Sequence, residues 1–337
     1  MILGVEMGAA HVGVALTDLR GRVLAWHTRL HPVRTDPLGT RSLIGELCHV
    51  CLEEAAQGRP LLGIGIAVPS PVDPAKPDGG LTEVVLPKWE GRLGLEGLSA
   101  RLGAPLMVDN DANLGALCEH WWGAGRDVDD LAYIKVATGI GCGFVIDGEI
   151  YRGATGVAGE IGHLAITPHG KRCLCGLRGC LVTLVGTPAL VERTAELLGD
   201  DVSEARSVLA GQVLTIGDIE KAALDGDPVA RQVVTEAAEY LGIAVAGLLN
   251  LMNPAMVVFG GDLAGLGEML LGPIRETVRQ RTLVSQVTAA TLVTSTLGTQ
   301  SIAVGAATMI LKDALADGRL LASGDRPTDT DAKVPTS

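Results

Sequence analysis

Aromatic residues are scarce in this sequence. Phe, Trp and Tyr make up 3% of the 337 residues, although apolar residues in total make up 47%. The core must therefore be mainly aliphatic. A chain of this length exceeds what one hydrophobic core usually serves, so we expect two domains.

The sequence also lacks long apolar runs and an export signal. No apolar run reaches eighteen residues, and the first residues, MILGVEMGAAHVGVAL, have no basic segment ahead of the apolar one. A transmembrane helix and a secretory signal peptide are both unexpected on this pattern. Seven cysteines without an export signal are typical of free thiols in the cytoplasm. We therefore expect a cytoplasmic protein with no membrane partner.

Basic charge is in deficit. Lys and Arg number 27 against 39 Asp and Glu, which gives a formal net charge of −12, and no local basic patch interrupts this balance. Such a surface repels phosphate backbones. We expect no direct contact between this chain and nucleic acid.

Three of the seven cysteines lie within eight positions, ten residues after a histidine. His163, Cys173, Cys175 and Cys180 supply one imidazole and three thiolates, the ligand set of a closed structural Zn²⁺ site without an open position for water. Such a metal would hold a loop, and Glu160, three residues before His163, would be oriented by it. The alternative is a group of free thiols with no special role.

The first part of the chain reads as alternating strands and helices. Strands are expected at 2–6, 12–17, 22–26, 61–68 and 105–108, and helices at 43–56 and 95–102. The last of these strands runs into DNDAN at 109–113, at the start of another helix. Polar side chains at the carboxyl end of a strand occupy the usual ligand side of an α/β sheet.

A second round of the same pattern begins near residue 130. We expect strands at 131–137, 143–146 and 256–259, a glycine-rich turn at 138–143, and helices at 228–251 and 301–315. Each half opens with a strand, a glycine turn and a strand. This weak repeat predicts a duplicated α/β domain with a cleft between the copies. The Pro-, Thr- and Asp-rich residues 324–337 are expected to be a disordered tail.

These motifs resemble the ROK family of sugar kinases and sugar-responsive repressors, which have the duplicated actin- and hexokinase-like (RNase H-like) ATPase fold. The resemblance runs from Ile2 to about Leu315 and is most specific at GEIGH, 159–163, followed by CLCGLRGC, 173–180. It implies a smaller domain at 1–118, completed by a C-terminal helix at about 301–316. It also implies a larger domain at 119–300 carrying the zinc loop 163–180, and a homodimer.

A sugar kinase needs a carboxylate to deprotonate the sugar hydroxyl. Asp111 is the candidate base, and Asn110, Glu160 and His163 are candidates to hydrogen-bond the sugar, the imidazole through its metal-free nitrogen. The resemblance implies the same four roles. The alternative for Asp111 is helix capping, since Asp and Asn are ordinary N-cap residues.

Glycine turns are candidates to grip the phosphates of ATP with Mg²⁺, because glycine lets backbone N–H groups approach phosphate oxygens. Candidate nucleotide-binding residues are Glu6, Gly8, Thr138, Gly139, Gly141, Gly260 and Gly261. Each glycine pattern taken alone is more often an ordinary turn between elements.

The sequence departs from the kinases of the family at several positions. Glu6 replaces a shorter aspartate, Ala10 lacks the hydroxyl usual in the first phosphate loop, and Val182 lies where a glutamate touches the sugar. Ser70 replaces a glycine between two prolines, and Val85 lies where an asparagine is frequent. Each lost hydrogen bond costs about 0.5 to 1.5 kcal/mol. Together they weaken hexose phosphorylation, abolish it, or change which sugar is accepted.

Two functions remain open on the sequence. The chain is an ATP-dependent kinase of a hexose or N-acetylhexosamine with Asp111 as base, or a sugar-sensing regulator domain without turnover. Family repressors carry an N-terminal helix-turn-helix of roughly 60 residues, and the first predicted strand here begins at Ile2. The surviving aspartate and the lack of room for such a module before Ile2 favour the kinase by a small margin. A sensor whose DNA-binding module lies outside this sequence, or one that acts through another protein, stays open.

Overall fold

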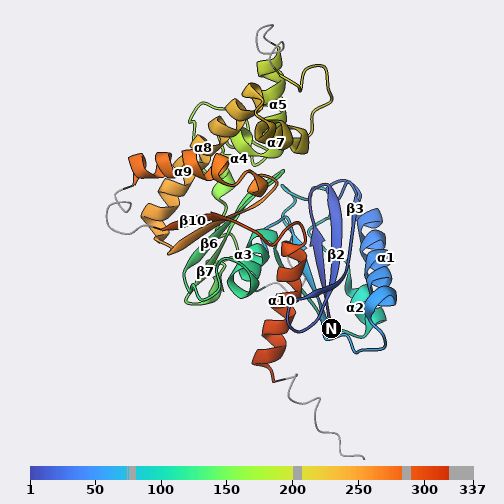
Figure 1. The fold of residues 1–337 in the computed structure, drawn as a ribbon. Coiled ribbons are helices and arrows are strands. Elements are labelled where there is room, and N and C mark those ends of the chain that lie inside the picture. Colours follow the sequence, from blue (N-terminus) through green and yellow to red (C-terminus); the bar gives the residue numbers. More distant parts are fainter. Residues whose placement is uncertain (74, 76–80, 200–206, 283–289, 319–337) are drawn as a thin grey trace, which may run out of the picture.

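The computed structural model describes residues 1–73, 75, 81–199, 207–282 and 290–318. Two five-stranded sheets, each mixing parallel and antiparallel pairs, form the two halves of the molecule (Figure 1). The predicted α/β class is thereby confirmed. The tail predicted at 324–337 lies outside the described residues.

The first sheet is a meander extended by two parallel strands. Its order is β3 (Val23–Leu30), β2 (His11–Thr17), β1 (Ile2–Met7), β4 (Gly63–Val68) and β5 (Leu106–Asn110). The first three strands pair antiparallel, and β4 and β5 run parallel to β1. The strand expected at 22–26 continues to Leu30, because it pairs along the whole of β2.

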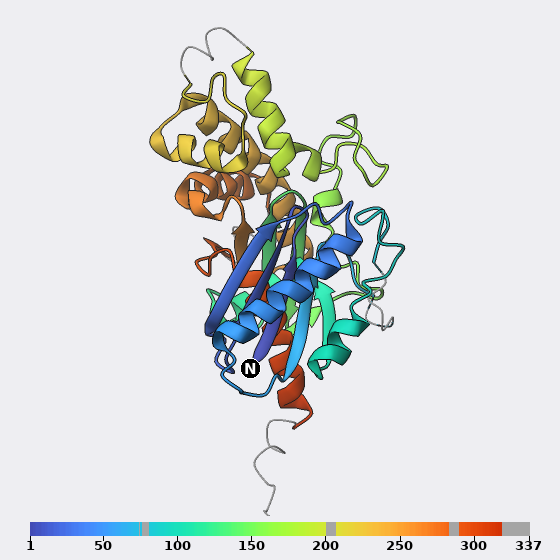
Figure 2. The same cartoon turned by 90° about the vertical axis from the view of Figure 1, so that its right-hand side faces the viewer.

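Helices cover both faces of this sheet. They are α1 (Pro37–Ala55), α2 (Glu96–Leu102) and α10 (Ser301–Ala316). Figures 1 and 2 show α1 on one face and α10, from the far end of the chain, on the other. A Cβ atom at Gly4 or Gly65 would lie within 2 Å of a backbone carbonyl oxygen of α10. Glycine at these positions therefore lets β1 and β4 pack directly on that helix.

The second sheet carries the second glycine-rich segment. Its order is β10 (Thr291–Thr294), β9 (Met256–Gly261), β6 (Leu131–Val136), β7 (Ile140–Ile146) and β8 (Glu149–Tyr151). The turn expected at 138–143 is shorter than predicted, because β7 begins at Ile140 and pairs with β6 from there. Gly141 and Gly143 are strand residues. A Cβ at Gly143 would lie 2.2 Å from the carbonyl oxygen of Ala112, so this glycine admits the helix that packs on β7.

Helices also cover both faces of the second sheet. One face packs against α3 (Asp111–Trp122), and the other against a group of helices at the far end of the molecule (Figure 1). That group comprises α4 (Val182–Val185), α5 (Thr187–Leu198), α7 (Ile216–Asp225), α8 (Pro228–Met252) and α9 (Glu268–Arg281). Two 3₁₀ turns, η1 (Ile161–His163) and η2 (Ala264–Leu266), complete the half. Of these helices, the sequence pattern predicts α8 and does not predict α5, α7 or α9.

Helix α8 is long and apolar enough to cross a membrane by length and composition, and no other helix among the described residues passes that test. Most of its apolar stretch is buried inside the protein, against the second sheet and neighbouring helices. It is the core helix of its half.

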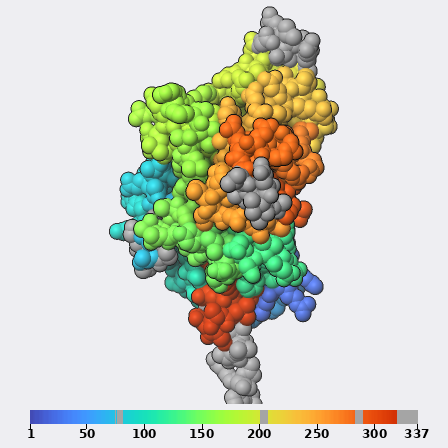
Figure 3. All heavy atoms as spheres, turned by 90° about the vertical axis from the view of Figure 1, so that its left-hand side faces the viewer, coloured from blue at the N-terminus to red at the C-terminus, as the bar shows by residue number. Residues whose placement is uncertain are grey.

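The two halves form one continuous surface in the space-filling view, with α8 and α9 toward one end and the last turns of α10 toward the other (Figure 3). Helix α3 lies between them, because it contacts α10 on one side and β6 and β7 on the other. The division of the chain at residue 118, inside this helix, stays a prediction.

Candidate functional site

The site is built around the junction of β5 and α3. Asn110 ends the strand and caps the helix: its Oδ1 accepts hydrogen bonds from the backbone N–H groups of Ala112 and Asn113 at 2.9 and 3.3 Å. Its Nδ2 donates to the carbonyl oxygen of Ser70 at 3.2 Å. The capping role considered for Asp111 thus belongs to Asn110, and Asp111 has its carboxylate free for another contact.

The carboxylate of Asp111 contacts a lysine. Asp111 Oδ2 lies 2.7 Å from the Nζ atom of Lys135 in β6, and both side chains are largely buried. Burial tends to lower the pKa of Lys135, but the nearby carboxylates of Asp111 and Glu6 outweigh it and the pKa is raised. Lys135 is therefore a charged ammonium, and Asp111 is the partner that compensates its burial.

Glu160 and His163 lie next to this pair, on the segment that leads through η1. Burial raises the pKa of Glu160, and the charge of Asp111 adds to the effect, so the two carboxyl groups are close. Glu160 Oε2 is 3.7 Å from His163 Nε2. The fold therefore brings Asn110, Asp111, Glu160 and His163 together, as expected from the sequence, and their roles stay predictions.

The four predicted metal ligands also converge. The side-chain ligand atoms of His163, Cys173, Cys175 and Cys180 all lie within 4.8 Å of one another. Cys173 Sγ is 3.7 Å from His163 Nδ1, and Cys175 Sγ is 3.6 Å from Cys180 Sγ. Ligands about 2.0 to 2.3 Å from a tetrahedral Zn²⁺ are separated by roughly 3.5 to 3.8 Å. The group fits such an ion, with Nδ1 facing the ligands and Nε2 facing Glu160.

The turn between β1 and β2, the first candidate phosphate loop, is covered by the side chain of His11. Glu6 is buried at the end of β1, its Oε1 lies 3.5 Å from His11 Nε2, and its Oε2 is buried without a hydrogen-bond partner. A Cβ at Gly8 would lie 2.3 Å from the His11 ring. The ring therefore covers the turn between β1 and β2, where the sequence analysis placed a phosphate contact.

The second glycine segment has an open turn and a packed strand. A Cβ at Gly139 would meet no atom within 4 Å, which leaves the backbone between Thr138 and Ile140 accessible to a ligand. At Gly141 it would lie 3.1 Å from the Ala112 side chain, so that glycine serves the packing of α3. Of the two glycines, Gly139 has the better geometry for approaching a phosphate.

The glycines at the end of β9 serve the packing of the sheet. A Cβ at Gly260 would lie 2.1 Å from the hydroxyl oxygen of Tyr133, and Gly261 has a φ of +87° that favours glycine. The next residue, Asp262, donates its backbone N–H to the carbonyl oxygen of Val136 at 2.7 Å. Burial raises the pKa of Asp262 although the positive charge of Lys135 opposes the shift, so this carboxyl group also borders the cluster.

An ion pair between a buried carboxylate and a half-buried arginine joins the two halves beside the site. Asp109 is 2% exposed, and its Oδ2 accepts hydrogen bonds from Nε and Nη2 of Arg152 at 2.9 and 2.6 Å. Asp109 belongs to β5 of the first sheet and Arg152 follows β8 of the second. The pair thus ties the strand that carries Asn110 to the opposite half.

The structure adds His11, Asp109, Lys135, Arg152 and Asp262 to the residues found from the sequence. The sequence carries a signal for Lys135, the one charged residue in the otherwise apolar segment LAYIKVA, and for Asp262, which directly follows the glycine pair. No local signal marked Arg152, because its partner lies 43 residues away.

At the positions that depart from the kinase pattern, the residues present form hydrogen bonds of their own or belong to a helix. Ser70 is fully buried and its Oγ accepts the backbone N–H of Thr82 at 2.9 Å. The carbonyl oxygen of Val85 accepts a hydrogen bond from Arg34 Nε at 3.0 Å, and Val182 begins α4.

Comparison with known proteins identifies the family. The ROK family profile matches residues 2–313. The chain belongs to the ROK family. The xylose repressor of Caldicellulosiruptor bescii is 32% identical over 93% of this chain and 79% of its own length. ROK members thus include a sequence relative of this chain that acts as a repressor.

The solved structures similar to this chain include both a sugar kinase and a transcriptional regulator. A ROK family glucokinase from Streptomyces griseus, in complex with glucose and AMPPNP, superposes with a TM-score of 0.78 at 28% identity, covering 91% of this chain and 98% of its own. A ROK family transcriptional regulator, a homologue of the E. coli MLC protein, superposes with a TM-score of 0.79 at 31% identity, covering 95% and 80%. The predicted family and the two-domain actin-like ATPase fold are confirmed, and both functional classes remain represented.

Proposed function

We propose that this chain is a sugar-binding ROK domain that senses a hexose or N-acetylhexosamine without phosphorylating it. The observation that carries the proposal is the buried ion pair of Asp111 and Lys135, at 2.7 Å. A carboxylate that accepts a hydrogen bond from an ammonium is a weaker base than a free one. The candidate base is thus held in a structural contact, and a bound sugar would use it as a hydrogen-bond acceptor.

The sugar contacts follow from which polar atoms remain available. Asp111 keeps Oδ1, Glu160 has its carboxyl group beside Asp111, and His163 offers Nε2. Asn110 has its Oδ1 engaged by two backbone N–H groups, so it contributes one remaining Nδ2 hydrogen. Vicinal hydroxyls of a pyranose suit such a row of acceptors with one donor.

Zn²⁺ would be held by His163, Cys173, Cys175 and Cys180, and its part would be structural, since four protein ligands leave no position for water. Bound zinc would hold the His163 ring so that Nε2 faces Glu160 and the sugar site. The homodimer and the cytoplasmic location stay predictions.

A sugar kinase using Mg²⁺ and ATP is the second candidate. It is favoured by the open turn at Gly139 and by the likeness to a glucokinase that binds glucose and AMPPNP. In that case Asp111 would have to part from Lys135 before accepting a proton from the sugar hydroxyl.

The test is a pair of measurements on one panel of hexoses and N-acetylhexosamines: calorimetric binding, and coupled ADP release with Mg-ATP. We expect at least one sugar to bind and none to give turnover. Asp111→Asn should lower the affinity for that sugar by tenfold or more, whereas Asp313→Asn, on α10, should leave it unchanged. Turnover that Asp111→Asn abolishes would establish the kinase instead, and absence of binding by every sugar would reject both candidates.

A further inference from the structure

Three carboxylates act on one buried lysine at the base of the site. Lys135 Nζ contacts Asp111 directly, and Glu6 and Asp262 are close enough to interact with it electrostatically. Glu6 is 4% exposed, and its Oε2 has no hydrogen-bond partner although it is buried. His11 lies on the other side, 3.5 Å from Glu6.

The alternation of side chains along β6 explains why Lys135 points into the site. Side chains alternate along β6: Ile134 and Val136 enter the core beneath the helices α8 and α9, and Tyr133 packs on the opposite face. Lys135 shares the face of Tyr133, which α3 covers, and so it meets the first residue of that helix. Asp262 follows Gly261, which pairs with Val136 on the adjacent strand.

A divalent cation does not fit this arrangement. Mg²⁺ takes six oxygen ligands in near-ideal octahedral geometry and usually keeps several waters. An ammonium 2.7 Å from Asp111 Oδ2 occupies the lone pair that a metal ion would use and repels a second cation at that distance. Mg²⁺ at this place would need Glu6, Asp111 or Asp262 as ligands, and the Asp111 oxygen it would use is already bound to the Lys135 side chain.

We propose that the Lys135 ammonium replaces the divalent metal ion of the site. This ammonium group is part of the chain itself and compensates the negative charge of Glu6, Asp111 and Asp262. The cleft is therefore ready to bind a sugar when no Mg²⁺ is present. This deepens the proposed sensing function and rests on it. It also identifies one residue that separates a metal-dependent cleft from a metal-independent one.

The test measures Mn²⁺ binding to the full chain without sugar. Binding is monitored by calorimetry and by the electron paramagnetic resonance signal of free Mn²⁺. Mn²⁺ has the ligand preference of Mg²⁺ and a direct signal. Lys135→Met removes the charge at similar length, and Lys135→Arg is the matched control that keeps it. We expect Lys135→Met to bind one Mn²⁺ at least tenfold more tightly than the wild type and Lys135→Arg. Adding Asp111→Asn to Lys135→Met should abolish the gain.

Equal Mn²⁺ affinity in the wild type and Lys135→Met overturns the proposal, and so does tight Mn²⁺ binding by the wild type. Because Lys135→Met leaves Asp111 buried without a partner, Lys135→Gln is measured beside it. Gln keeps a donor to Asp111 without the charge and should gain Mn²⁺ binding as well. Circular dichroism and zinc content confirm that each variant is folded.

The metal titration needs neither sugar nor nucleotide, so its failure is separable from that of the proposed function. Turnover by the wild type would reject the sensor whatever Mn²⁺ does. An unchanged Mn²⁺ affinity with intact sugar binding would reject the role of Lys135 alone.

Discussion

At the scale of single residues, the cost of burying charge dominates. Lys135 and Asp111 lie in a largely aliphatic interior, where each charge is tolerated because the other compensates it. Asp109 and Arg152 follow the same rule. Glu119 does not: it is fully buried, and its Oε1 has no hydrogen-bond partner.

Glu119 should therefore make stability depend on pH. Burial raises the pKa of Glu119 above the ordinary glutamate value of 4.5 in the folded protein, so the unfolded chain releases this proton at a lower pH than the folded one. The contribution of Glu119 to stability is greatest at low pH and decreases as the pH rises from about 4.5 through the raised pKa. We expect the unfolding free energy of the wild type minus that of Glu119→Gln to fall as the pH rises over that interval. Urea unfolding at a series of pH values measures it. In the control, Glu83→Gln at an exposed position, the difference should stay flat.

At the scale of elements, local sequence predicted most strands and the long helices, and erred where tertiary contacts decide. The segment 138–143 was expected to be a turn because it is rich in glycine, but β7 pairs with β6 from Ile140, and its glycines make room for α3. Helix α9 contains Pro273 after Gly272, two residues that argue locally against a helix. Burial of Leu270, Leu271, Ile274 and Val278 against the helical core outweighs that preference.

The loop from His163 to Cys180 is the element that carries the proposed zinc site. Cys175→Ser removes one of its four ligands, so we expect zinc content to fall from about one ion per chain toward zero and sugar affinity to fall with it. Elemental analysis and calorimetry measure the two quantities. Cys51→Ser is the control, because Cys51 is buried in α1 among first-half core residues and should leave the zinc content unchanged. Full zinc occupancy in Cys175→Ser would contradict the assignment.

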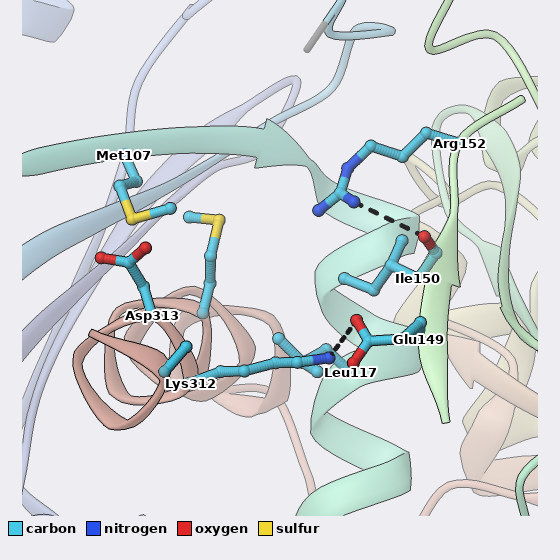
Figure 4. Close-up of a pocket in the computed structure, with 9 residues that line it drawn as sticks. Met107, Leu117, Glu149, Ile150, Arg152, Lys312 and Asp313 are labelled. Atoms are coloured by element: carbon cyan, nitrogen blue, oxygen red, sulfur yellow. Dashed lines mark hydrogen bonds and ion pairs between the residues drawn. The ribbon is translucent and has the colours of Figure 1, made fainter. Parts of the chain in front are cut away.

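At the scale of the whole molecule, the two halves are joined near the site by side chains from distant segments. Arg152 from the second half binds Asp109 of the first, and Lys312 in α10 lies 2.5 Å from Glu149 in β8. Arg152, Glu149 and Lys312 line a pocket of about 230 Å³, which Met107, Leu117, Ile150 and Met309 also line. Figure 4 shows Lys312 directed toward Glu149 in this pocket. The halves are therefore connected by these polar contacts as well as by the packing of α3 between them.

Loss of the pair between Asp109 and Arg152 should loosen this connection. Arg152→Met leaves Asp109 charged and 2% exposed without its main partner, so we expect a loss of stability of about 3 kcal/mol. We also expect weaker sugar binding and a larger radius of gyration in small-angle scattering. Lys312→Met breaks the exposed pair with Glu149 and should cost less than about 1 kcal/mol. Equal effects of the two substitutions would argue against a special role for Arg152.

The amino-acid sequence alone was sufficient for the family and the α/β class. It was also sufficient for the group of four candidate metal ligands that converge in the structure, and for the start of helix α3 after Asn110. Those features are local: a few residues of fixed spacing determine which side chains lie together, whatever the rest of the chain does. The pairing of Asp111 with Lys135, 24 residues apart, and that of Asp109 with Arg152, 43 residues apart, depend on how β5, β6 and α3 pack. Strand register and helix packing set those contacts, and the energy that selects them comes from burial across both sheets, which no short stretch of sequence contains.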